Sequence, residues 1–210
     1  MAAAARAVQP TRGELLKLRK RIDLAKRGHE LLKEKRDALV TEFFDTLDRF
    51  EKVRGEMREK LENAFEKLIY SQIIMGSLDL RKAVEASMRD LEVDIGTRNI
   101  MGVKVPVVEP EDVRRKIMER GYSLHQSSPK LDEAAKEFES VLETILELAE
   151  IYKTVKLLAR EIEKTKRRVN SLEHVLIPRI EESIEYIEMR LEELERENFF
   201  RLKRVKAEME

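Results

Sequence analysis

Few residues in this chain have the types and spacing that catalysis or metal binding requires. His29 and Glu30 begin like the zinc motif HExxH, but Lys33 occupies the position of the second histidine, so the motif fails. The other histidines, His125 and His174, lie far apart in the sequence. The sequence contains no glycine-rich phosphate loop of the GxxxxGK or GxGxxG type. We therefore expect no catalytic residue, no metal site and no cofactor-binding site.

The composition points to long helices with charged outer faces. Asp, Glu, Lys and Arg make up 40% of the 210 residues, where about 25% is usual. Carboxylates on the solvated faces of such helices are not shielded from water as acid–base catalysis requires. The 42 acidic residues balance the 42 basic ones, which argues against a nucleic-acid-binding protein. The sequence contains no cysteine, which excludes disulfides and thiol chemistry.

The sequence offers no segment for direct insertion into a membrane. No apolar run approaches the roughly 18 residues that a membrane-spanning helix needs. The first residues, MAAAARAVQ, are too short and too weakly apolar for a secretory signal. We expect a cytoplasmic protein that attaches to a membrane complex only through its partners.

The first long helix is predicted for residues 11–75. Thr11 and Glu14 fit a capping box, with Thr11 as the N-cap. Apolar residues then recur at spacings of three and four, which is typical of a coiled coil. This stripe consists of Leu15, Leu18, Ile22, Ala25, Leu32, Leu39, Phe43, Phe50, Val53 and Met57.

The second long helix is predicted for residues 129–206. Ser128 is the expected N-cap and Pro129 the first helical residue. Pro178 falls inside the pattern, where it should remove one backbone hydrogen bond and could kink the helix. The apolar stripe runs through Phe138, Val141, Ile145, Leu148, Tyr152, Val155, Ala159, Ile162, Val169, Leu176, Ile180, Ile187 and Leu194.

The connecting region, residues 76–128, has a different pattern. Apolar and polar residues alternate through Leu91, Val93 and Ile95, and again from Val103 to Val107, which predicts two strands. We expect a β-hairpin over residues 91–108, with GTRNIMG as its loop. Short helices are expected on either side, around 77–90 and 110–120.

The charges and the chain connectivity favour an antiparallel pairing of the two long helices. Residues 12–36 carry ten basic and four acidic side chains, whereas residues 181–197 carry eight Glu. A parallel pairing would also set the basic block beside acidic residues, but the connection would then have to return along the full helix length. The sequence thus predicts a mainly α fold in a single elongated domain, 1–210: an antiparallel two-helix coiled coil with a β-hairpin and small helices at the connecting end.

Three segments do not fit an ordinary coiled coil. The first, Pro10–Gly13, is most simply a helix start, and the other two are candidates for partner contacts. Antiparallel pairing should bring Thr11–Arg21 beside Phe199–Lys206, where two adjacent phenylalanines cannot both face one seam. At the predicted hairpin tip, two apolar side chains are expected to be exposed. The alternatives are a self-packed loop at the tip and a frayed helix end. The candidate residues are Arg98, Ile100, Met101, Phe199, Phe200, Arg201, Lys203 and Arg204.

These segments, in this order, resemble the D subunit of the archaeal and vacuolar-type rotary ATPases. The resemblance covers essentially the whole chain. It rests on PTRGELLKLRKRI at 10–22, TRNIMGVKVP at 97–106, and the later stretches RRVNSLEHVLIPRIEESIEYI and ENFFRLKRVK. The hairpin segment and the LIPR and ENFFRLKR stretches are specific, because coiled coils otherwise match one another by composition alone.

The resemblance implies a mechanical role without catalysis. In this family the helical hairpin is the central-stalk axle inside the catalytic hexamer of A and B subunits. It binds the small F subunit and connects, through the socket subunit called C or d, to a membrane ring driven by protons or sodium ions. We therefore expect a peripheral protein at the cytoplasmic face of the cell membrane. The alternative is a prefoldin-like coiled-coil chaperone, which a holdase assay would distinguish.

Overall fold

A computed structural model describes residues 9–110, 113–122 and 127–209 of the chain. The fold is mainly helical, with one two-stranded antiparallel sheet, which confirms the predicted fold class. The chain divides into two compact units. Unit 1 comprises the residues up to Ala38 together with those from Ile162, and unit 2 comprises Leu39–Glu161.

The long helices begin at the residues that their capping signals indicate. Helix α1 spans Arg12–Met75, and the hydroxyl of Thr11 accepts the N–H of Glu14 at 3.2 Å. Helix α3 spans Pro129–Ser171, and the hydroxyl of Ser128 accepts the N–H of Lys130 at 3.3 Å. Each hydroxyl satisfies one of the N–H groups that the first turn of a helix leaves unpaired.

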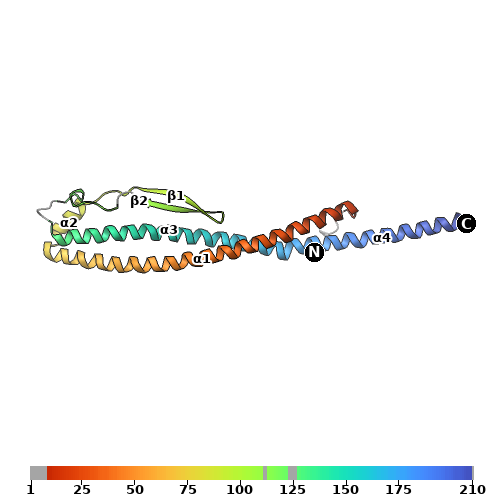
Figure 1. Ribbon diagram of the computed structural model, residues 1–210, viewed down its shortest axis with the longest axis horizontal. Coiled ribbons are helices and arrows are strands. Elements are labelled where there is room, and N and C mark those ends of the chain that lie inside the picture. The colour runs from red at the N-terminus through yellow and green to blue at the C-terminus, as the bar shows by residue number, and fades with distance from the viewer. Residues whose placement is uncertain (1–8, 111–112, 123–126, 210) are drawn as a thin grey trace. The chain divides into compact units, whose positions relative to one another are not determined.

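In unit 1, α1 pairs with the antiparallel helix α4, Ile177–Met209 (Figure 1). Three ion pairs cross the interface: Arg12–Glu195 at 2.5 Å, Arg19–Glu188 at 2.6 Å and Lys26–Glu181 at 2.9 Å. Their members lie seven residues apart on both helices, so the same face repeats every two turns. Beneath these pairs the core consists of Leu18, Ile22, Ile180 and Ile187, flanked by Leu15, Leu176, Ile177, Ile184, Tyr186 and Leu191.

A π-helical turn, Leu172–Leu176, connects α3 to α4. The N–H of Ile177 bonds to the carbonyl of Leu172, five residues earlier. Buried Thr165 and Ile180 lie 15 residues apart, which is two heptads plus one residue. The wider π turn accommodates that additional residue. Pro178 is the second residue of α4, and the helix continues through it.

Unit 2 contains the remainder of α1 and the beginning of α3, joined through helix α2, Ser77–Ala86, and the hairpin. Gly76 allows the turn between α1 and α2, because its φ of 82° is strained for residues with a side chain. Ion pairs Arg49–Glu147, at 2.6 Å, and Lys67–Glu137, at 2.5 Å, cross between α1 and α3. The buried apolar residues of the two helices here are Leu39, Val53, Ala64, Leu131, Ala134, Val141, Ile151 and Leu158.

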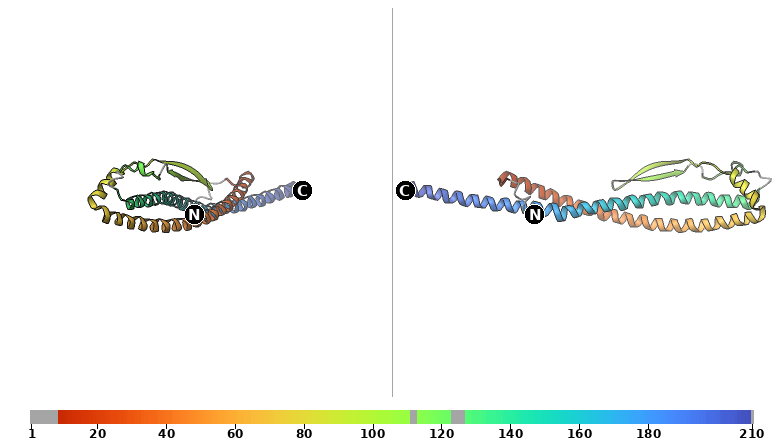
Figure 2. Two further views of the ribbon diagram at one scale, coloured as in Figure 1. Left: turned by 60° about the vertical axis from the view of Figure 1, so that its left-hand side comes forward. Right: turned by 180° about the vertical axis from the view of Figure 1, so that it is seen from behind.

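The β-hairpin consists of β1, Val93–Ile100, and β2, Val103–Pro110, and it lies along α3 in both figures (Figures 1 and 2). The predicted loop GTRNIMG was too long. Its residues 96–100 pair in the ladder, and only Met101 and Gly102 form the turn. The predicted helix around 77–90 corresponds to α2. In the described part of 110–120, the only helical segment is the single 3₁₀ turn Ile117–Glu119.

Candidate partner-binding surfaces

The hairpin turn holds Met101 in a left-handed conformation. Its φ is 50°, and that of Gly102 is 87°, as in the two-residue turns that match the twist of a hairpin. The side-chain oxygen of Asn99 accepts the N–H of Gly102 at 2.8 Å. Met101 is 49% exposed. The turn therefore presents a methionine to solvent at a position that normally favours Asn, Asp or Gly.

Ile100 is not fully exposed, contrary to the prediction from the sequence. It is half-buried and, with Arg98, lines a hollow against Ile151 of α3. The buried side chains of Val103 and Val105, and a 3.0 Å hydrogen bond from the N–H of Val108 to Glu150, also hold the hairpin on the helices. The exposed apolar side chain at the tip is thus Met101, while Ile100 packs toward α3.

The C-terminal part of α4 continues past the start of α1 (Figure 1). Arg12, the first residue of α1, already pairs with Glu195. The expectation that Thr11–Arg21 lies beside Phe199–Lys206 was therefore wrong, because the start of α1 pairs with residues of α4 that precede Phe199, namely Glu188 and Glu195. We call residues 196–209 the α4 overhang.

The predicted site residues of the overhang are all exposed. Phe199 and Phe200 are each 67% exposed, and their rings make a T-shaped contact at 6.3 Å. Arg201, Lys203 and Arg204 are also exposed. The overhang thus brings two aromatic rings and three cations together on one solvent-exposed helix, at a distance in sequence from the hairpin candidates.

A second apolar surface, at the end of α1 and the start of α2, was not predicted from the sequence. Its side chains are between 55% and 73% exposed. Exposed apolar clusters of this kind mark contact surfaces. The sequence signal was available, since these residues fall outside the apolar stripe of the coiled coil. They are Ile69, Tyr70, Ile73, Ile74 and Leu78.

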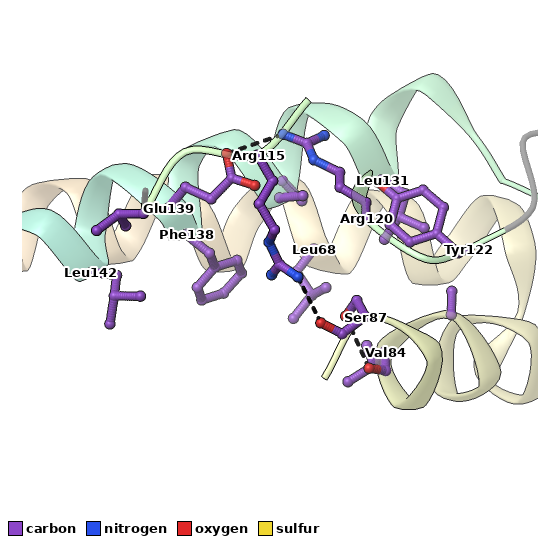
Figure 3. A pocket seen from close by; sticks show the side chains of 14 residues that line it. Leu68, Val84, Ser87, Arg115, Arg120, Tyr122, Leu131, Phe138, Glu139 and Leu142 are labelled. Carbon is purple, nitrogen blue, oxygen red and sulfur yellow. Dashed lines mark hydrogen bonds and ion pairs between the residues drawn. The ribbon is translucent and has the colours of Figure 1, made fainter. Parts of the chain in front are cut away.

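A buried polar cluster fastens the segment after the hairpin to α3 (Figure 3). Arg120 is 2% exposed and donates to Glu139 at 3.2 Å and to the carbonyl of Asp132 at 3.1 Å. The hydroxyl of Tyr122 donates to Asp132 at 2.5 Å. Burial, and then this hydrogen bond to a carboxylate, raise the pKa of Tyr122.

The same segment lines a largely apolar pocket. Arg115 donates to the carbonyl of Ser87 at 2.9 Å and crosses the pocket between α2 and α3 in Figure 3. Leu68, Val84, Leu131 and Phe138 form its apolar walls. The sequence analysis did not predict this pocket or the burial of Arg120. A single arginine in a sequence gives no sign that its side chain is buried.

The histidines do not assemble into a site. His29 lies 3.4 Å from Glu173 across the helix pair of unit 1, whereas His174 is exposed. His125 falls outside the described residues. Among residues 9–110, 113–122 and 127–209, no three His, Cys, Asp or Glu side chains come together as metal ligands. No helix in these ranges is long and apolar enough to cross a membrane.

Comparisons with known proteins identify the family of the chain. The family described as the D subunit of ATP synthase matches residues 14–207. The D subunit of the A-type ATP synthase of Thermococcus gammatolerans is 54% identical over 203 residues, covering 97% of this chain and 95% of the relative. Its counterpart in Pyrococcus horikoshii is 51% identical with the same coverage, and that in Methanobrevibacter smithii is 52% identical over 97% and 88%. The chain belongs to the family of ATP synthase D subunits.

Proposed function

We propose that this chain is the central-stalk rotor axle of a proton- or sodium-coupled rotary ATP synthase. It transmits rotation between the membrane ring and the catalytic hexamer of A and B subunits. The observation that carries the proposal is the heptad-spaced set of ion pairs, Arg12–Glu195, Arg19–Glu188 and Lys26–Glu181, in a chain of this family. A helix pair locked in a fixed register resists the sliding that an applied torque would cause.

The charged outer faces of the helices suit a rotor that turns inside the hexamer of A and B subunits. Most ion pairs on the helices are exposed; the side chains of Arg19 and Glu188, for example, are 57% and 40% exposed. Exposed pairs contribute only about 0–1 kcal/mol each, so a charged surface binds a passing charged surface weakly. We infer that the chain supplies no catalytic residue and acts through the subunits that surround it.

We assign the exposed surfaces to different partners in the complex. The α4 overhang, with Phe199 and Phe200, is the part that enters the A/B hexamer. The apolar end formed by Ile69, Tyr70, Ile73, Ile74 and Leu78 is suited to the socket subunit, C or d, because a static joint gains from apolar burial. The F subunit is expected to bind elsewhere on the chain, outside residues 199–210. Attachment to the cytoplasmic face of the membrane then comes entirely through these partners.

Deletion of residues 199–210 tests the proposal. It removes Phe199, Phe200 and the basic cluster, while the core of unit 1 ends at Leu191. The truncated chain should fold, bind the F subunit and assemble with the A/B hexamer, but ATP hydrolysis and rotation should lose their coupling. Unchanged torque would show that other parts of the shaft carry the coupling. Loss of binding to the F subunit would place that partner at the overhang and contradict the assignment of surfaces.

A further inference from the structure

The α4 overhang and the turn before it carry an apolar face that nothing in the described chain covers. Leu194 is 46% exposed, Leu202 70%, Val205 49% and Met209 83%. With Asn198 they follow spacings of three and four, so they continue the stripe of Ile187 and Leu191 that faces α1. An unpacked helical segment of this length is marginal in water. The face therefore requires a partner helix.

A groove begins where the overhang leaves α1. It has a volume of roughly 590 Å³ and runs between the first turns of α1 and the adjoining turns of α4. Its apolar walls are Leu15, Leu16 and Leu191, and Leu16 is 59% exposed. The α4 side also contributes three carboxylates, from Glu188, Glu192 and Glu195. The α1 side contributes two arginines, Arg19 and Arg12, which pair with Glu188 and Glu195, so the lining keeps a net negative charge. The groove thus fits a helix with apolar and basic residues.

The overhang contains such apolar and basic residues. Its sequence is also self-complementary about Asn198: residues of 191–195 and 201–205 that lie at equal distances before and after Asn198 have opposite charge or are both apolar. Counted from Asn198, Arg201 and Glu195 lie at equal distances in opposite directions, and so do Arg204 and Glu192. Lys203 and Glu193 form a third such pair. The apolar residues follow the same rule, since Leu202 mirrors Leu194 and Val205 mirrors Leu191.

We propose that the free chain forms a symmetric dimer in which each overhang lies antiparallel in the groove of the other copy. The two-fold axis passes close to Asn198. Each basic segment, 201–206, then faces residues 190–195 of the partner copy, which include Glu192, Glu193 and Glu195, and the two apolar stripes cover one another. Such an interface is isologous, because the same surface serves both copies.

In this dimer the apolar face of the α4 overhang is shielded from solvent when the chain is not assembled with other subunits. The overhang is also the part that we assign to the A/B hexamer, so dimerisation and insertion exclude one another. The dimer itself does not depend on that assignment, because it rests only on the geometry of unit 1. A failure of either proposal leaves the other standing.

The mass of the full-length chain in solution tests the dimer. Sedimentation equilibrium over a dilution series should give twice 24.7 kDa at micromolar concentration. Leu202→Asp should weaken the dimer about 100-fold, because each of two symmetric leucine contacts is worth about tenfold. Leu24→Asp is the matched control, since Leu24 is 73% exposed on α1 but does not line the groove; this variant should remain dimeric.

Charge exchange and cross-linking test the orientation of the two copies. Arg204→Glu alone should weaken the dimer a few-fold, and the double variant Glu192→Arg/Arg204→Glu should recover it. The chain has no cysteine, so Asn198→Cys introduces a single thiol close to the two-fold axis. Mild oxidation should link this variant into a covalent dimer, whereas Leu24→Cys should remain unlinked.

Three outcomes would overturn the proposal. The first is a chain that stays monomeric throughout the dilution series. The second is a dimer that persists in Leu202→Asp and fails to cross-link through Asn198→Cys, because the interface would then lie elsewhere. The third is a monomer that sediments with vesicles of anionic phospholipid, which would make the basic overhang a lipid-binding helix.

Discussion

Arg19 and Glu188 form an ion pair at 2.6 Å, one heptad from the pairs Arg12–Glu195 and Lys26–Glu181. Replacing Arg19 with Glu would put two acids opposite one another in the middle of this series. We expect the free energy of unfolding to fall by about 0.5–1 kcal/mol, because the side chains are partly exposed. The double variant Arg19→Glu/Glu188→Arg should restore it. Urea titrations of the four proteins would measure the coupling, and additive losses would show that the pair makes no contribution.

Arg120 should matter far more to stability than the neighbouring Arg114. Replacing buried Arg120 with Met would leave the carboxylate of Glu139, which is 9% exposed, without its cation. We expect a loss of about 3–5 kcal/mol in unit 2, and recovery in the double variant Arg120→Met/Glu139→Leu. The control is Arg114→Met, because its 2.8 Å pair with Glu143 is exposed and its loss should change the stability far less. Equal losses in denaturant titrations would contradict the importance of burial.

Tyr122 should make the stability of the protein depend on alkaline pH. Its pKa is raised by burial and by the hydrogen bond to Asp132, so the folded protein holds the phenolic proton more firmly than the unfolded chain. The stabilisation is therefore complete below the ordinary tyrosine pKa of about 10 and is lost as the pH rises through the folded value. The difference in unfolding free energy between the natural chain and Tyr122→Phe should shrink over that range. A difference that is constant with pH would contradict the raised pKa.

The sequence predicted those features that depend on local periodicity. The apolar stripes through Leu18 and Ile180 and the alternation from Val103 to Val107 indicated the helices and the hairpin. The burial of Arg120 could not be foreseen in this way, because it depends on carboxylates from α3 that only the tertiary fold brings near. The start of the overhang was also missed, since charge blocks indicate an orientation but do not fix the register of pairing.

The turn at Met101 was missed because propensity argues against it. A methionine rarely adopts a φ of 50°, which costs roughly 1–2 kcal/mol in the left-handed region. The seven-residue loop predicted for this segment avoided that strain. In the structure Gly102 and the side chain of Asn99 stabilise the short turn, and Ile100 gains contact with the helices.

That strain gives a test of the predicted contact role of Met101. Met101→Asn should stabilise the hairpin by about 1 kcal/mol, because Asn-Gly is the preferred sequence of this turn. If the exposed methionine serves a partner, assembly or stimulation of ATP hydrolysis should nevertheless decrease. Amide exchange of the strands and ATPase assays of the reconstituted complex would measure the two effects separately. A variant that is both more stable and fully active would remove Met101 from the partner-contact residues.

The π-helical turn at Leu172–Leu176 has two candidate causes, and a deletion distinguishes them. Pro178 cannot donate a backbone hydrogen bond, whereas the 15-residue spacing from Thr165 to Ile180 requires one residue more than two heptads. We expect the spacing to be the cause, so Pro178→Ala should keep the π turn. Deleting the exposed His174 should restore regular α-helix and rotate α4 by about 100°.

That rotation should turn Ile180 and Ile187 away from α1, although both are almost completely buried in the natural chain. At about 1.5–3 kcal/mol for each buried isoleucine, the deletion should cost about 3–6 kcal/mol of unfolding free energy. His174→Ala is the matched control, since it removes the same side chain and keeps the chain length. Denaturant titrations and amide exchange across α4 would measure the change. If the deletion variant proves as stable as His174→Ala, the additional residue does not determine which residues of α4 face α1. Pro178 would then be the cause of the π turn.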